Sequence, residues 1–226
     1  SVRLPAGYCG VVGLKATLGL IDMAGIVGLS KSLDHVGPLC RSVRDAKLML
    51  EILAGPTSTS WSAKAPMRSD LSGLRIGVLE QIPGPDCTPD VALGFEKALA
   101  EASALGAQIV RLSLENLEPR RLRRDAFLVT EAEGAKALAT SLQREPEAYS
   151  DNLKAMLDYG RNLPADRLDA AYRHLAGMKE ALVSLFDEID LLMTPTALQT
   201  AFSFADPVPT NQAEITGLAN VAGCPA

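Results

Sequence analysis

Ser1 is the residue whose type and position point most directly to chemistry. It opens the run Ser-Val-Arg-Leu-Pro-Ala-Gly-Tyr-Cys-Gly-Val-Val-Gly-Leu-Lys, which spans residues 1–15. A serine hydroxyl attacks a carbonyl carbon only when a base takes its proton, so the residue type alone predicts no activity. One alternative is that the amine of Ser1 itself acts as this base, as in N-terminal nucleophile enzymes.

Other potential nucleophiles and bases are few. Cys9 lies near Ser1 in the sequence, and His35 directly follows an aspartate, so a serine or cysteine triad deserves consideration. We interpret Cys9 as a buried small hydrophobic residue and His35 as a loop residue, and expect His174 to face solvent from a helix. Trp61 leaves two interpretations open, a platform for a ligand or a surface anchor.

The sequence lacks the usual signals of a metal or cofactor site. Its four cysteines, at positions 9, 40, 87 and 224, form no Cys-x-x-Cys pair, and its two histidines lie far apart. The glycines of the first forty residues form neither a Gly-Lys-Ser/Thr nor a Gly-x-Gly-x-x-Gly motif. We therefore expect no metal and no cofactor.

Composition narrows the classes of partner. The 226 residues are 47% hydrophobic and 22% charged, with a net charge of -5. The arginines at positions 120, 121, 123 and 124 form a short cluster among acids, so nucleic acid is not an expected partner. No long uncharged apolar stretch predicts a membrane span. Scattered cysteines are typical of reduced cytoplasmic proteins, and the sequence leaves a homo-oligomer open.

Hydrophobic spacing predicts an α/β domain. Residues 74–79 and 108–112 are typical of strands, and residues 89–105 between them have helical periodicity with a proline in the first turn. A crossover of this length implies that the two strands are parallel. We also expect a helix after Ser42, which is a good N-cap, and a buried strand at 189–193.

The remaining segments complete this prediction. Residues 118–187 are expected to be helical with breaks near Pro146 and Pro164, and residues 196–209 to form a loop. The glycine-rich start suits tight turns rather than a long helix. We predict one domain, residues 1–226, with a layered α/β/α arrangement and a mixed, largely parallel sheet. The ends of the sequence suggest a domain cut from a longer protein on both sides.

Several segments, in order, resemble the amidase signature family. Residues 1–15 resemble the stretch that follows its Gly-Gly-Ser nucleophile motif, with Arg, Pro, Cys-Gly and Gly-Leu-Lys in place. Residues 33–46 resemble its Asp-x-x-Gly-Pro segment, 190–195 its Asp-to-Pro strand, and 220–226 its Asn-x-x-Gly-x-Pro-Ala segment. The resemblance implies an incomplete amidase-signature fold with Ser1 at the position of the nucleophile.

The family mechanism is amide hydrolysis by a serine, a cis-serine and a lysine, a variant of the serine triads. Of these groups only Ser1 maps onto this sequence, because the family's lysine and cis-serine precede the nucleophile. Lys15 matches the Gly-Leu-Lys that follows it, which is not the catalytic lysine, and Arg3 matches an arginine that we interpret as holding the nucleophile loop. Ala16 and residues 19–25 depart from the family pattern, so the substrate stays open.

The resemblance leaves three functions to weigh. The first is an amidase that cleaves carboxamide C–N bonds of a small-molecule amide, inactive when only residues 1–226 are present. The second is a glutaminase-type subunit of a tRNA-dependent amidotransferase, which requires partner subunits. The third is a catalytically dead scaffold. An upstream lysine together with a Gly-Ser-Ser-Gly-type turn would distinguish the enzymes from the scaffold.

Overall fold

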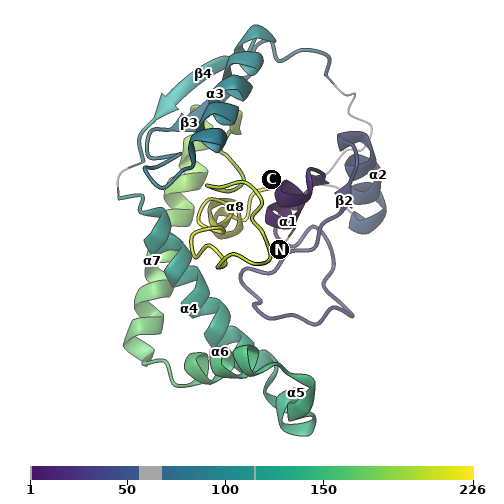
Figure 1. Ribbon diagram of the computed structural model, residues 1–226, viewed down its shortest axis with the longest axis vertical. Helices are drawn as coiled ribbons and strands as arrows, with labels where there is room; N and C mark the ends of the chain where they lie inside the picture. The colour runs from purple at the N-terminus through teal and green to yellow at the C-terminus, as the bar shows by residue number, and fades with distance from the viewer. Residues whose placement is uncertain (1, 56–67, 115) are drawn as a thin grey trace.

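The computed structural model describes residues 2–55, 68–114 and 116–226, and Figure 1 shows their arrangement. Ser1 and Trp61 lie outside the described residues. The helices are α1 (Arg3–Cys9), α2 (Val43–Ala54), α3 (Pro89–Ala104), α4 (Pro119–Ala137), α5 (Ala139–Arg144), α6 (Asp151–Arg161), α7 (Ala165–Ser184) and α8 (Thr216–Ala222), with 3-10 turns η1 (Pro146–Ala148) and η2 (Leu185–Asp187). The strands are β1 (Val12–Gly13), β2 (Leu39–Cys40), β3 (Arg75–Leu79), β4 (Gln108–Leu112) and β5 (Leu191–Leu192).

The predicted strand–helix–strand unit is confirmed. Strands β3 and β4 are parallel, with Ile76 opposite Ile109, and α3 connects them. Strand β5 joins the other side of β3, also in parallel, so the order is β4-β3-β5. Gly77 in the central strand is required by packing, because a Cβ there would lie 2.5 Å from the Ile189 side chain. The α/β class and its parallel sheet are as predicted.

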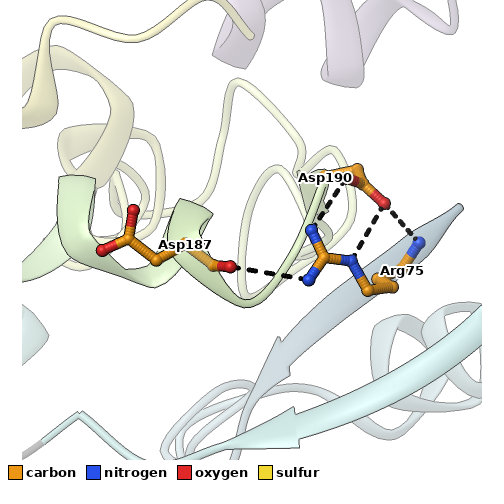
Figure 2. Close-up of polar contacts among 3 residues, drawn as sticks. All are labelled: Arg75, Asp187 and Asp190. Carbon is orange, nitrogen blue, oxygen red and sulfur yellow. Dashed lines mark hydrogen bonds and ion pairs between the residues drawn. The ribbon is translucent and has the colours of Figure 1, made fainter.

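An exposed ion pair joins Asp190, the residue before β5, to Arg75, the first residue of β3. Asp190 accepts hydrogen bonds from the backbone N–H of Arg75 at 2.8 Å and from its guanidinium Nη2 at 3.0 Å (Figure 2). The same guanidinium approaches the Asp187 carbonyl oxygen at 3.5 Å. These hydrogen bonds hold the pKa of Asp190 below its ordinary value. They fix where the short strand begins.

The first forty residues contain a helix that the glycine content did not predict. Helix α1 has seven residues and ends at Gly10, whose φ of 64° is left-handed. The antiparallel pair β1-β2 follows and forms a separate sheet. Backbones approach closely here, because a Cβ on Gly37 would lie 1.9 Å from the Leu14 carbonyl oxygen. Glycine therefore serves close packing in this region as well as turns.

Helices α4 and α7 run side by side away from the sheet, with α6 and α5 near their far end (Figure 1). The breaks predicted near Pro146 and Pro164 fall after α5 and α6. A core of aliphatic side chains from α4, α7 and α8, including Leu122 and Leu182, continues to the sheet. No helix in the described ranges is long and apolar enough to span a membrane.

The expectation that His174 faces solvent is wrong. Its side chain is 14% exposed, and its Nδ1 lies 2.7 Å from Asp125 Oδ2 across the α4–α7 interface. Asp125 also lies 3.8 Å from the Arg121 guanidinium, one helical turn away. The sequence neighbours of His174, Arg173 and Leu175, do not reveal which carboxylate α4 places opposite the ring.

Candidate active site

A cavity of about 520 Å³ is lined in part by Val2, the residue that follows Ser1. Its walls come from the start of α1, from a loop within residues 23–36, and from α4 and α8. Two helical stripes with spacing i, i+3, i+4, i+7 line it. They are Arg123, Ala126, Phe127 and Thr130 on α4, and Ala213, Thr216, Gly217 and Asn220 at and before α8.

Arg3 ties the start of α1 to α8. Its Nη2 donates to the Thr216 carbonyl oxygen at 2.6 Å and to the Asn220 side-chain oxygen. Burial lowers the pKa of Arg3 to about 10, so the guanidinium is charged at neutral pH. These bonds connect two segments of the chain that lie more than 200 positions apart in the sequence.

Asn220 extends this tie to the loop. Its Nδ2 donates to the Leu33 carbonyl oxygen at 2.9 Å, and His35 Nδ1 lies 2.8 Å from the same oxygen. A carbonyl oxygen only accepts, so Nδ1 of His35 carries the proton and Nε2 is the free acceptor of the neutral ring. Burial, and then the charge of Lys15, lower the pKa of His35. The ring is therefore neutral at pH 7.

His35 lines the cavity, and its Nε2 is buried without a hydrogen-bond partner among the described residues. The sequence interpretation placed His35 in a loop, which is where it lies, but did not anticipate its contact with the cavity. The lone pair of Nε2 is therefore unused in this structure, and its burial keeps it away from solvent.

Lys15 is buried in the cavity wall, with 2% of its surface exposed. Its Nζ donates to the Ala16 carbonyl oxygen at 3.0 Å. Burial, reinforced by the charge of Arg3, lowers the pKa of Lys15 to about 8. Its backbone pairs with Ala226 in both directions, at 2.6 and 2.9 Å. The family pattern gives Lys15 no catalytic role, although a lysine within an apolar Val-Val-Gly-Leu-Lys-Ala run is a signal of burial.

The loop of the cavity is fastened to α4 by a carboxylate. Glu133 accepts from Ser30 Oγ at 2.6 Å, from the Ser32 backbone N–H at 3.0 Å and from the Tyr172 hydroxyl at 2.9 Å. Burial raises the pKa of Glu133, but the hydrogen bonds prevail and leave it below the ordinary value. Asp34 caps the same loop from inside, accepting from the Ser30 backbone N–H at 2.8 Å.

Two further expectations concern cysteines and metals. Cys9 is exposed, so the interpretation as a buried hydrophobic residue is wrong. It is the last residue of α1, next to the capping residue Gly10. All four cysteines are free. Within the described ranges no group of three or more His, Cys, Asp or Glu side chains has the arrangement of a metal site.

A family model described as Amidase matches residues 1–226. This chain belongs to the amidase family. The cavity lining includes four residues from the segments that resemble this family, namely Arg3, Lys15, His35 and Asn220. Ser1, the expected nucleophile, lies outside the described residues.

Comparisons with individual proteins agree with the family. The chain is 32% identical to the A subunit of the glutamyl-tRNA(Gln) amidotransferase from Thermosynechococcus vestitus, over 100% of the chain and 54% of that protein. A solved amidase matches with a TM-score of 0.85 at 26% identity, over 100% of this chain and 52% of that one. The corresponding A subunit from Thermotoga maritima matches with a TM-score of 0.78 at 26% identity, over 100% and 52%. The amidase-family chain spans about half the length of the relatives it matches.

Proposed function

We propose that this chain is part of an amidase that hydrolyses carboxamide C–N bonds of a small-molecule substrate, with Ser1 as the nucleophile. The observation that carries the proposal is the cavity that Val2 helps to line, because five of its polar lining residues come from the segments that resemble the amidase family, namely Arg3, Lys15, Asp34, His35 and Asn220. The cavity has a suitable size for a small molecule. Arg3 and Asn220 both line this cavity and are hydrogen-bonded to each other, which holds α1 and α8 together at its wall.

The proposed reaction has two steps. The Ser1 hydroxyl loses its proton to a base and its oxygen bonds the amide carbon, after which the C–N bond breaks and the amine leaves with a proton. Water then attacks the acyl-serine ester, releasing the acid and restoring the hydroxyl. By the family's pattern the base is a lysine acting through a second serine, both upstream of Ser1. Backbone N–H groups around the serine stabilise the oxyanion.

The chain is proposed as one domain, continued on both sides in a longer cytoplasmic protein that requires no cofactor. Residues 1–226 alone would then be inactive, because the lysine, the second serine and the turn before Ser1 belong to the rest of the protein. Losing a single oxyanion donor typically costs about a hundredfold in kcat or more. Tests of activity therefore require the intact gene product.

A second candidate is a glutaminase-type subunit of a tRNA-dependent amidotransferase. It is favoured by the relatives at 29–32% identity, several of which are A subunits of glutamyl-tRNA(Gln) amidotransferases. This candidate predicts hydrolysis of glutamine that increases when partner subunits and charged tRNA are added. The first candidate predicts turnover of other amides by the protein on its own.

The test of Ser1 compares the intact protein with its Ser1→Ala variant on a panel of aryl amides and glutamine. Ser1→Ala should lower kcat by about a thousandfold or more, since the other groups cannot form the acyl intermediate. Ser184→Ala is the matched control, an exposed serine on α7 whose hydroxyl bonds its own helix. An intact protein that turns over no amide would favour the dead scaffold, and an unimpaired Ser1→Ala variant would sink the assignment of the nucleophile.

A further inference from the structure

Arg123 places a guanidinium in the wall of the candidate active-site cavity without a hydrogen bond. Its side chain is 26% exposed, and its Nε is buried and unpartnered among the described residues. The Glu214 carboxylate lies 3.7 Å from Nε, an ion-pair distance but not a hydrogen bond. The guanidinium also lies 5.8 Å from the centre of the Phe127 ring, one turn along α4. The guanidinium is therefore held near Glu214 and Phe127, but its N–H groups donate no hydrogen bond to a described residue.

The other charges of the cavity are already engaged. Arg3 donates to Thr216 and Asn220, Lys15 to the Ala16 carbonyl oxygen, and Asp34 accepts from the backbone of its own loop. The lining thus contains three cationic side chains and one carboxylate. Among the lining guanidiniums within the described residues, that of Arg123 makes no hydrogen bond; its Nε is buried, which leaves the two terminal Nη groups as donors for a ligand.

Glu214 offsets part of this charge without using the donors. It is 3% exposed and stands 3.8 Å from Arg120 as well as 3.7 Å from Arg123, while Arg120 has a second partner in Asp86. The ion pair with the buried Glu214 carboxylate restrains the guanidinium at its Nε atom. Such an arrangement orients the planar fork, whose free N–H groups match the two oxygens of a carboxylate.

The rest of the cavity wall is apolar. The lining is rich in large hydrophobic side chains, namely Met23, Ile26, Val27, Leu29, Leu33 and Phe127. Apolar surroundings strengthen a charge-assisted hydrogen bond because they lower the local dielectric constant. A ligand suited to this cavity has an apolar body and an anionic end.

We propose that the substrate is a small amide with an apolar body and a carboxylate, and that Arg123 binds that carboxylate. This inference rests on the proposed amidase function and adds its substrate class. Of the four arginines at positions 120–124, Arg123 is the one in the α4 stripe that lines this cavity.

The test uses two pairs of probe amides on the intact protein. One pair is the mono-4-nitroanilide of glutaric acid and its methyl ester; the other is N-butyryl-4-aminobenzoate and its methyl ester, which move the carboxylate to the leaving group. In at least one pair the carboxylate should give a kcat/KM about 10- to 100-fold higher than its ester, the range of one charged bidentate contact. Equal kcat/KM values in both pairs would overturn the carboxylate proposal.

The variant Arg123→Gln should remove this preference, because it lowers kcat/KM for the carboxylate probes about 10- to 100-fold more than for their esters, which lack the charged contact. Arg124→Gln is the matched control, the next residue of α4, exposed and outside the lining of this cavity. Removing Arg123 leaves Glu214 buried beside one arginine, so the double variant Arg123→Gln, Glu214→Gln guards against misfolding. A preference that survives in a folded double variant contradicts the role of Arg123.

A binding measurement separates this inference from the proposed function. Calorimetry with the Ser1→Ala protein records the binding of each carboxylate probe and its ester without turnover. Tighter carboxylate binding that disappears in the Ser1→Ala, Arg123→Gln protein supports the anion site even if no amide is hydrolysed. Turnover of both esters and carboxylates at equal rates, with equal affinities, leaves the amidase function standing and removes the substrate class.

Discussion

The sheet and the cavity are held together by different forces. Strands β3 and β4 pair through five consecutive backbone positions, and α3 covers them with an apolar stripe that includes Phe95 and Leu99. The cavity walls instead meet through single side chains, such as Arg3, which bonds a residue 217 positions away. Backbone pairing distributes stability over many groups, whereas each cavity contact is one bond whose loss leaves buried partners unsatisfied.

We therefore expect substitutions to affect activity more in the cavity walls than in the sheet. The sheet region contains an arginine, Arg75, whose exposed pair with Asp190 is replaceable by water. The cavity region contains Arg3, buried enough that burial lowers its pKa to about 10. Both arginines join segments far apart in the sequence, so they form a natural pair for measurement.

The largest effect is expected from Arg3→Ala. The change leaves the Thr216 carbonyl oxygen and the Asn220 amide oxygen without their donor, which should cost about 2–5 kcal/mol in the free energy of unfolding. It should also lower kcat/KM by about a hundredfold or more, because Ser1 loses the anchor two residues away. Denaturant unfolding and steady-state kinetics of the intact protein measure the two losses.

Arg75→Ala is the control for this comparison. Its removal should leave kcat/KM within about twofold and change the midpoint of unfolding only slightly, since the pair is exposed. If the two alanine variants behaved alike, the distinction between a distributed sheet and a singly tied cavity would be wrong.

The sequence predicted the sheet well because its signals are local. Residues 74–112 show a strand, a proline at the start of a helix, helical periodicity and a glycine at its end, and each signal acts within a few residues. The family motifs also identified residues that line the cavity. They did not reveal that Arg3 meets Asn220, or that Lys15 and His35 share one wall, because these contacts depend on how α8 packs.

The errors have the same origin. Helix α1 escapes prediction because Gly7 lowers helix propensity, and a helix of seven residues is stabilised by tertiary contacts rather than by propensity. Cysteine is usually buried, yet the position of Cys9 at the end of α1 exposes it. The environment of His174 depends on Asp125 of another helix. Local rules do not contain this information.

The buried charge of Lys15 should make the free energy of unfolding depend on pH. The pKa of Lys15 is lowered to about 8 in the folded protein from an ordinary value of 10.5, so the unfolded chain binds more protons between these values. The free energy of unfolding contributed by Lys15 should therefore rise as the pH increases from 8 to 10.5, by at most about 3 kcal/mol.

The measurement is the difference in unfolding free energy between the intact protein and its Lys15→Met variant, taken at several pH values from 7 to 10.5. Met keeps the volume of the apolar stem and removes the titration. A difference that rises with pH supports a lysine that is costly to protonate when folded. A flat difference would mean that Lys15 is better solvated than its 2% exposure indicates.

A smaller effect than that of Arg3→Ala is expected from Glu133, whose carboxylate binds the cavity loop to α4 through several hydrogen bonds. Glu133→Gln keeps the shape but replaces an anionic acceptor by a neutral amide, which should cost about 1–2 kcal/mol and lower kcat/KM by about tenfold as Ser30 and Ser32 loosen. Tyr172→Phe removes one donor to the same carboxylate and leaves the loop contacts in place, so its effect on kcat/KM should be below about threefold.

Kinetics of both variants across pH 4 to 8 provide the decisive readout. The hydrogen bonds lower the pKa of Glu133, so the stability they supply is present above the ordinary carboxyl range and is lost as the pH falls through the lowered value. The intact protein should lose activity in acid more steeply than Glu133→Gln, which has no carboxylate to titrate. Parallel acid limbs in the two proteins would show that the loop is held by its own backbone contacts, and that this wall of the cavity resembles the sheet more than the Arg3 tie.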